Sequence, residues 1–292
     1  MSEQIASRLV RSITRTTLLV FLLTLACIDG QIRRLFFGLR KGRAGAVWVH
    51  GWSKRIVRAL GIACTVCGPL PECEAGRSMA VVSNHLSYLD ILISSAARPF
   101  VMVAKSEVRG WPLLGWITAQ AGTVYVQRAD VKGGRTQTHA EVNGLMAEAF
   151  GSGLPVLFYP EGTTTDGESV LPFRRGLFHS VLFANAQVRS AAVAYKLSEP
   201  NAGASVANDV CFWRDMEFVP HLFTCLGLKG LEGHLQFGDR AVEGGDRFAL
   251  AVNARAEVTA LYEGLCSASV EMLPEGVLTP HSPRVSRMTA TT

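Results

Sequence analysis

Val81-Val-Ser-Asn-His-Leu-Ser-Tyr-Leu-Asp90 is the stretch that decides how this chain folds. The apolar run Met79–Ser83 is typical of a buried strand, and it stops at a polar Asn84-His85 pair. Ser87 is then a good helix N-cap, and Tyr-Leu-Asp-Ile-Leu-Ile after it is typical of the first turns of a helix. The stretch therefore predicts a strand, a short turn and a helix in direct succession.

His85 and Asp90 are five positions apart, which corresponds to about 140° on an ideal helix. They can therefore meet only if His85 precedes the helix and Asp90 reaches back from its first turn. A carboxylate placed there fixes the imidazole tautomer and stabilises the imidazolium that forms when the histidine accepts a proton. The alternative is a capping box formed by Ser87 and Asp90, which leaves Asn84 and His85 without a role.

Composition indicates a basic end on a mildly acidic body. The chain has 292 residues, of which 48% are apolar and 18% charged, and its net charge is +5. Residues 1–58 alone carry eleven Lys or Arg and two acidic residues. Because apolar runs separate these cations, we expect the membrane surface as partner and no nucleic acid. Seven cysteines without regular spacing indicate a reducing compartment, and Cys64-Thr-Val-Cys67 lacks the further ligands that a metal needs.

Two apolar segments near the N-terminus predict membrane association. The thirteen residues Thr16–Ile28 would cover about 20 Å as a helix, which is short of the ~30 Å hydrocarbon core. Ala46–Leu60 has tryptophans and aliphatic residues at helical spacing, edged with cations. We expect residues 1–60 to form a helical hairpin that dips into one leaflet at the cytoplasmic face of the (inner) membrane. A single short span is the alternative for the first segment, and a core-facing helix is the alternative for the second.

Strand and helix signals alternate from Gly61 onward. Strands are predicted over 62–66, 79–83, 100–104, 123–127, 154–159, 191–195 and 233–238, and helices over 88–97, 137–150, 177–185 and 247–265. This alternation predicts an α/β fold with a mixed central sheet flanked by helices. Residues 61–272 would form the main domain, and residues 273–292, rich in Pro, Ser and Thr, a loose tail.

A second motif, Leu157-Phe-Tyr-Pro-Glu-Gly-Thr-Thr-Thr-Asp-Gly167, runs from a buried strand into a polar turn. Glu161 and three threonines lie there beside exposed backbone amides. Such a turn can hold an anionic or polyhydroxyl headgroup. Taken alone, the motif favours an ordinary polar loop with good turn chemistry.

Together the two motifs resemble the glycerolipid acyltransferase family, which includes 1-acylglycerol-3-phosphate acyltransferases. The resemblance extends over about residues 60–240, and its order and spacing fit the family. It rests on Asn84-His85-Leu-Ser87-Tyr-Leu-Asp90, Ala104-Lys105-Ser-Glu, Pro112-Leu-Leu-Gly115-Trp, Gly122-Thr-Val-Tyr-Val-Gln-Arg128, Phe158-Tyr-Pro160-Glu161-Gly162-Thr163 and Phe173-Arg-Arg-Gly176. It implies that residues 61–272 are an acyltransferase domain that uses neither a metal nor a cofactor.

The resemblance also implies roles for individual residues. His85 would deprotonate the acceptor hydroxyl, which then attacks the thioester of an acyl carrier protein or coenzyme A, while Asp90 orients His85. Backbone amides near Gly162 would stabilise the oxyanion. Lys105 and Arg128 would contact the acceptor headgroup, with Arg174 or Arg175 as a further cation. The full set of substrate-binding candidates is Asn84, Ser87, Lys105, Arg128, Glu161, Gly162, Thr163, Thr164 and Arg174.

Two departures bear on the acceptor lipid. Thr164 stands where phosphatidic-acid-forming members continue Glu-Gly-Thr-Arg, and the loss of that bidentate phosphate ligand weakens the case for lysophosphatidate. Ala191-Ala-Val-Ala194 lacks the proline usual there, which we interpret as a local backbone change. The expected acceptor is lyso-ornithine lipid or a related lysolipid, and 1-acyl-sn-glycerol-3-phosphate is the alternative. A non-catalytic lipid-binding protein on the same fold is the alternative of another class.

Overall fold

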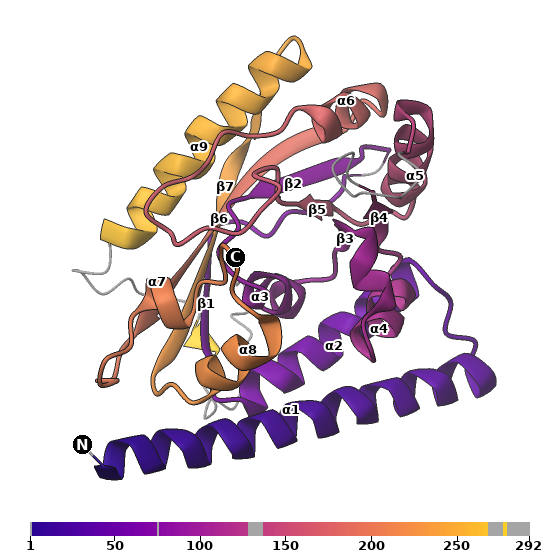
Figure 1. The fold of residues 1–292 in the computed structure, drawn as a ribbon. Helices are drawn as coiled ribbons and strands as arrows, with labels where there is room; N and C mark the ends of the chain where they lie inside the picture. Colours follow the sequence, from indigo (N-terminus) through magenta and orange to yellow (C-terminus); the bar gives the residue numbers. More distant parts are fainter. Residues whose placement is uncertain (1, 75, 128–136, 268–276, 279–292) are drawn as a thin grey trace, which may run out of the picture.

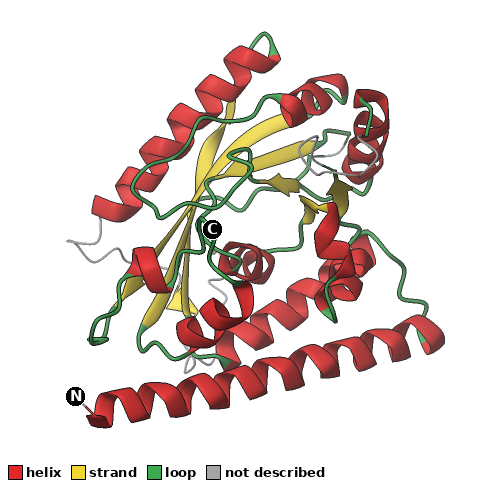
Figure 2. Ribbon diagram, in the orientation of Figure 1, coloured by secondary structure: helices red, strands yellow, loops and turns green. Residues whose placement is uncertain are grey.

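A mixed sheet lies between two layers of helices (Figure 1 and Figure 2) in the computed structural model, which describes residues 2–74, 76–127, 137–267 and 277–278. The strand order is β4-β3-β5-β2-β6-β7-β1-β8. The strands are β1 (Ala63–Cys67), β2 (Met79–Ser83), β3 (Val101–Lys105), β4 (Val124–Val126), β5 (Val156–Phe158), β6 (Gln187–Leu197), β7 (Leu231–Val242) and β8 (Val277–Leu278). The predicted α/β fold with a mixed central sheet is confirmed.

Strands β2 to β6 are parallel to one another, whereas β7 runs antiparallel to β6 and parallel to β1. Continuous apolar runs suit this arrangement because helices cover both faces of a parallel sheet. In β2, for example, Met79, Ala80, Val81 and Val82 are all buried. The run that predicted β2 is therefore apolar at successive positions and does not alternate.

Helices α9 and α6 pack on one face of the sheet, and α3 and α2 lie on the other, with α1 outside them along the lower edge of Figure 1. The helices are α1 (Ser2–Phe36), α2 (Arg43–Ala59), α3 (Leu89–Ala97), the 3-10 helix η1 (Ser106–Gly110), α4 (Leu114–Gln120), α5 (His139–Gly151), α6 (Gly176–Phe183), α7 (Val206–Asp209), α8 (Phe218–Leu226) and α9 (Arg247–Ser267). The sequence did not predict η1, α4, α7, α8 or β8. The predicted loose tail over 273–292 lies outside the described residues except for Val277–Leu278, which pair with β1.

Helix α1 is much longer than the apolar run that predicted it. Its 35 residues span about 50 Å. The added length is held by arginines on its inner face: Arg8 pairs with Asp209 at 2.6 Å, and Arg11 Nε donates to the Gly227 carbonyl at 3.0 Å. Arg15 donates to the Leu228 carbonyl at 2.6 Å. Because Arg11 and Arg15 reach carbonyls at the C-terminal end of α8, the helix dipole favours their charge.

Side-chain hydrogen bonds connect α1 to α2. Asp29 of α1 accepts hydrogen bonds from the indole nitrogens of Trp48 at 2.8 Å and Trp52 at 2.9 Å. At the next position, Gly30, a Cβ would lie 2.6 Å from the ring of Trp116 of α4 and 2.8 Å from the ring of Trp48 of α2, so glycine leaves room for both rings against α1. The two predicted N-terminal helices are thus packed as a pair against the body.

The outer face of α1 is apolar and exposed. Among the described residues, Glu3–Phe36 is the one helix that is long and apolar enough to cross a membrane. Its exposed apolar side chains include Ile13, Val20, Phe21, Leu25, Ile28, Ile32, Leu35 and Phe36.

Candidate active site

The candidate site lies at the edge of the sheet where the parallel strands end. His85 follows β2, Lys105 ends β3 and Glu161 follows β5, and these three strands are parallel neighbours in the order β3-β5-β2. In open α/β sheets, the carboxyl ends of the strands are the usual place for a ligand. The topology therefore brings both sequence motifs to one edge.

His85 and Asp90 meet in the turn between β2 and α3. The imidazole Nδ1 lies 2.6 Å from Asp90 Oδ2, so Nδ1–H donates and the lone pair is left on Nε2. Asp90 is completely buried, whereas the His85 side chain is 18% exposed. Because α3 begins at Leu89, the geometry expected from the five-residue spacing, with His85 before the helix, is confirmed.

Asp90 is fixed by donors on both oxygens. Oδ2 also accepts from the backbone amides of Leu86 at 2.7 Å and Ser87 at 3.0 Å, and Oδ1 accepts from the Tyr195 hydroxyl at 2.6 Å. The prediction that Ser87 caps the helix was wrong. Tyr88 occupies the N-cap position without a side-chain cap, because Asp90 itself satisfies the amides of the turn.

Tyr159 and Glu161 hold His85 from the second motif. The Tyr159 ring stacks on the imidazole with centroids 4.1 Å apart and planes 12° apart. Glu161 Oε1 accepts from the His85 amide at 2.7 Å, and Oε2 accepts from the Leu171 amide at 2.8 Å. In addition, the Thr165 amide donates to the His85 carbonyl at 3.0 Å. The two motifs are thus one hydrogen-bonded unit.

Burial raises the pKa of Glu161 to about 7, although its two bonds to backbone amides act in the opposite direction. The side chain is only 3% exposed, so water contributes little to the stability of its charged form. Glu161 therefore changes its charge near neutral pH while it is attached to the backbone of the histidine.

Three predicted substrate-binding residues lie behind the site, where they support its backbone and do not face the substrate. The amide side chain of Asn84 bonds both the N–H and the C=O of Val193 at 2.8 and 2.9 Å. Both oxygens of Glu161 are taken by backbone amides, and Ser87 is completely buried. A direct substrate contact does not fit this geometry for any of the three, because their polar atoms are enclosed or already bonded.

The turn Gly162–Thr164 is open to solvent. The Gly162 amide itself donates to the Tyr159 carbonyl at 3.1 Å, so it is not free for an oxyanion. Within the described chain, the amides of Thr163 and Thr164 donate no hydrogen bond. Thr163 is exposed and Thr164 half-buried. These two amides, and not that of Gly162, are the candidates for holding a developing negative charge.

Arg174 lies against Gly162. Gly162 has φ of +71°, and a Cβ there would lie 2.7 Å from Nε of Arg174. Arg175 turns away, with its guanidinium 4.6 Å from the ring centroid of Phe248. Of the two arginines, the structure therefore brings Arg174 to the site. Lys105 is exposed at the end of β3, and Arg128 lies outside the described residues.

Sequence reasoning missed Tyr195, Tyr159 and the supports of the second motif. Arg255 of α9 donates to the carbonyls of Val170 and Leu171, and Tyr262 donates to the Gly167 carbonyl at 2.6 Å. One signal was present for Tyr195. It ends an apolar strand, and a buried tyrosine hydroxyl generally finds a polar partner. The contacts of α9 had no comparable signal, because they join residues about 85 to 95 positions apart.

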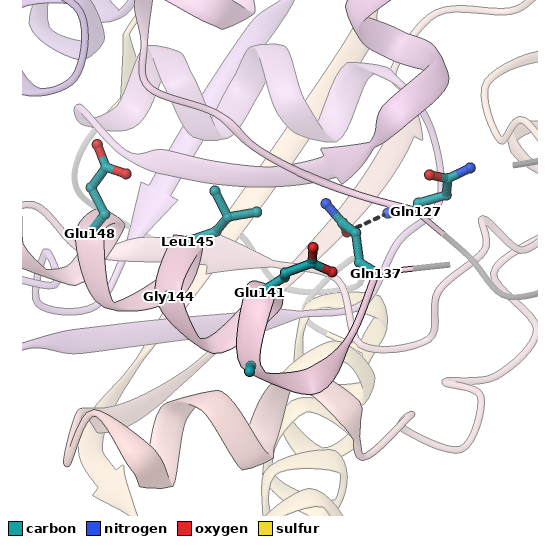
Figure 3. A pocket seen from close by; sticks show the side chains of 7 residues that line it. Gln127, Gln137, Glu141, Gly144, Leu145 and Glu148 are labelled. Carbon is teal, nitrogen blue, oxygen red and sulfur yellow. Dashed lines mark hydrogen bonds between the residues drawn. The ribbon is translucent and has the colours of Figure 1, made fainter. Parts of the chain in front are cut away.

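A separate cavity of about 530 Å³ lies along α5 (Figure 3). Gln127 and Gln137 close one end, where the Gln127 amide donates to the Gln137 side chain at 2.9 Å. Glu141 and Glu148 are on its wall. The cavity shares no lining residue with the His85 site, and its two carboxylates make it unsuited to an anionic headgroup.

Comparison with known proteins identifies the family. Residues 69–195 match the model of the family described as Acyltransferase. The chain is 34% identical over 189 residues to a 1-acyl-sn-glycerol-3-phosphate acyltransferase of Neisseria gonorrhoeae, covering 63% of this chain and 71% of that protein. It is 33% identical over 209 residues to a lyso-ornithine lipid O-acyltransferase of Pseudomonas aeruginosa, covering 71% and 75%.

The fold is shared with a solved structure. The crystal structure of the 1-acyl-sn-glycerophosphate (LPA) acyltransferase PlsC from Thermotoga maritima matches with a TM-score of 0.57 and covers 87% of this chain and 98% of that one. The sequence identity is 16%, so this likeness concerns the fold alone. The family match and the two sequence relatives show that the chain belongs to the acyltransferase family and is an enzyme of lipid biosynthesis.

Proposed function

We propose that the protein transfers a fatty acyl chain from an acyl thioester to the free hydroxyl of a lysolipid, with His85 as the general base. The observation that carries this proposal is the hydrogen bond between His85 Nδ1 and the buried Asp90. It leaves Nε2 as the basic nitrogen of a partly exposed imidazole, which is the arrangement that general-base catalysis requires.

The reaction begins when His85 Nε2 takes the proton of the acceptor hydroxyl as its oxygen attacks the thioester carbonyl carbon. Asp90 stabilises the imidazolium, and the amides of Thr163 and Thr164 donate to the tetrahedral oxyanion, an effect often worth a few kcal/mol. The C–S bond then breaks, the electron pair leaves with sulfur, and the imidazolium returns its proton to the thiolate. An ester and a free thiol result. The donor is the thioester of acyl carrier protein or of coenzyme A.

The acceptor is lyso-ornithine lipid or a related lysolipid in this proposal. Relatives named for lyso-ornithine lipid and for 1-acyl-sn-glycerol-3-phosphate have nearly equal identity, so similarity does not separate the two acceptors. Thr164 favours the former, because a threonine lacks the fork of donors that grips a phosphate monoester. Arg174 and Lys105 still supply positive charge near the site. The alternative acceptor remains 1-acyl-sn-glycerol-3-phosphate.

The enzyme docks on the membrane through α1 lying in the plane of one leaflet. A membrane-crossing α1 would have to break the ion pair of Arg8 with Asp209 of α7 and the bonds of Arg11 and Arg15 to carbonyls at the end of α8. In-plane docking keeps these bonds and buries the outward apolar face of the helix. The cytoplasmic face is the side on which acyl thioesters are made, so we place the domain of residues 61–272 there.

The test is product formation by the purified full chain in lipid vesicles. Acyl carrier protein and coenzyme A thioesters are each supplied with lyso-ornithine lipid or lysophosphatidate, and the products are identified by mass spectrometry. We expect an O-acylated product, and none from an acceptor whose free hydroxyl is replaced by hydrogen. Binding to lysolipid vesicles without acyl transfer from either donor would instead support the non-catalytic lipid-binding protein.

A further inference from the structure

The two oxygens of Asp90 have different partners. Oδ2 faces His85 and the amides of Leu86 and Ser87, whereas Oδ1 receives one hydrogen bond among the described residues, from the Tyr195 hydroxyl at 2.6 Å. Asp90 has no exposed surface, so bulk water does not reach Oδ1. The orientation of the carboxylate and the distribution of its charge between the two oxygens therefore depend on Tyr195.

The backbone near Tyr195 is fixed relative to the turn that carries His85. Strand β6 continues beyond the end of β2, and Asn84 bonds both backbone groups of Val193, two residues before Tyr195. Tyr195 is 6% exposed. Burial and the nearby charge of Asp90 raise the pKa of Tyr195 well above its usual value, so its hydroxyl stays protonated. It remains a donor at every pH at which the enzyme works.

Other titratable groups surround Asp90, but none of them bonds Oδ1. His85 and Glu161 lie on the side of Oδ2 and the turn. Tyr159, which directly follows β5, and Cys211, which precedes α8, lie close enough to interact with the charge of Asp90. Burial raises the pKa of Cys211 to about 12 and raises that of Tyr159 as well, so both stay neutral. Glu161 differs from Tyr159 and Cys211, because burial raises the pKa of its carboxyl to about 7, within the working range.

We propose that Tyr195 is a positioning residue for acyl transfer, whose hydroxyl holds Asp90 so that Oδ2 is aimed at His85 with a partly neutralised charge. The inference rests on the proposed roles of His85 and Asp90. Without the hydroxyl, the charge of Asp90 concentrates on Oδ2 and holds the imidazolium more strongly, so the base stays protonated to higher pH. If Asp90 itself takes up a proton in the absence of the hydroxyl, the acid limb of the pH profile of activity also moves to higher pH.

The experiment replaces Tyr195 by phenylalanine, which removes one oxygen and keeps the ring. We measure kcat/KM for a lysolipid acceptor between pH 5 and 9, with Tyr125→Phe as the matched control. The control also loses a hydrogen bond of a tyrosine hydroxyl, 2.8 Å to Thr118, but from a half-buried residue on the edge strand β4. Both variants are made in the Glu161→Gln background as well, which removes the titration of Glu161 from the profile.

We expect Tyr195→Phe to move the acid limb of kcat/KM upward by about half to one pH unit, since one unit corresponds to 1.36 kcal/mol. We also expect kcat to fall about tenfold at pH 7 with the acceptor KM nearly unchanged. Tyr125→Phe moves neither quantity. The limb still moves in the Glu161→Gln background.

If the acid limb of Tyr195→Phe does not move, the inference is overturned. This holds if the variant keeps its activity. It holds equally if activity and melting temperature fall together, because the hydroxyl then contributes to stability alone. A His85→Ala variant measured alongside separates this failure from a failure of the proposed function. If His85→Ala keeps its activity, the general base itself has been misassigned, and the Tyr195 inference fails with it.

Discussion

Glu161→Gln tests how the second motif supports the first. Glutamine resembles the neutral form of Glu161 at every pH, because one of its two terminal atoms can accept from a backbone amide and the other cannot. The ionised carboxylate accepts from both the His85 and Leu171 amides, at 2.7 and 2.8 Å. Wild type and variant should therefore differ only where Glu161 is ionised, which is above about pH 7.

The size of the difference follows from the bond that glutamine cannot make. A hydrogen bond to a charged group contributes about 1.5–3 kcal/mol. If the loss falls entirely on the position of His85 in the transition state, kcat/KM changes by about 10- to 100-fold, because each 1.36 kcal/mol is a factor of ten. The wild-type to variant ratio of kcat/KM should thus rise from about 1 at pH 5.5 to at least about 10 at pH 8.5.

Stability should change in the opposite direction. The raised pKa of Glu161 means that folding favours its neutral form, so its contribution to stability is full below the unfolded pKa of about 4.5 and is lost as pH rises through about 7. The glutamine variant carries no such charge. Relative to wild type, its free energy of unfolding should improve by up to about 3 kcal/mol between pH 4.5 and pH 8.

The assay is kcat/KM of both proteins at half-unit steps of pH, with urea unfolding of the same samples. Taking the ratio at each pH cancels every pH effect that the two proteins share. A ratio that is flat with pH, or one whose midpoint lies near 4.5, would refute the reasoning, since Glu161 would then carry its charge throughout the working range.

Three further outcomes are expected. Thr164→Arg should raise kcat/KM for lysophosphatidate relative to lyso-ornithine lipid, and a wild-type preference of a hundredfold for lysophosphatidate, about 2.7 kcal/mol, would contradict the proposed acceptor. Gly162→Ala should lower the melting temperature and reduce activity at least about tenfold. The new Cβ would clash with Arg174, and a φ of +71° costs an alanine about 1–3 kcal/mol. Activity equal to that of wild type would exclude Arg174 from the site. In a membrane-sedimentation assay, 1 M salt should release little of the intact protein, since screening removes only the electrostatic part of in-plane docking; quantitative release would rule that docking out.

The fold and the centre of the site could be predicted because their signals are local. The strand, turn and helix around His85 and the polar turn after β5 are each written in a few consecutive residues, and each predicted strand overlaps an observed one. Short elements such as α4 and α8 were not predicted. They have only seven and nine residues, too few for a helical pattern to stand out, and are stabilised by tertiary packing, α8 for example against α1.

The functions of individual polar residues were harder to predict, because a motif does not show which way its side chains point. Asn84, Ser87 and Glu161 lie within the motifs, yet the structure uses Asn84 and Glu161 to satisfy backbone groups and encloses Ser87. Likewise, the length of α1 was underestimated from the thirteen apolar residues of the N-terminal segment. The arginines that extend this helix find their partners more than 200 positions away.

The central claim, that His85 is the general base, is tested most directly by the kcat/KM of His85→Ala for acyl transfer. His139→Ala is the matched control, since His139 is an exposed histidine at the start of α5. We expect His85→Ala to fold but to lose about 10²- to 10⁴-fold in activity, because that is the usual contribution of a positioned base, and His139→Ala to behave as wild type. Near-normal turnover by a folded His85→Ala protein would contradict the mechanism.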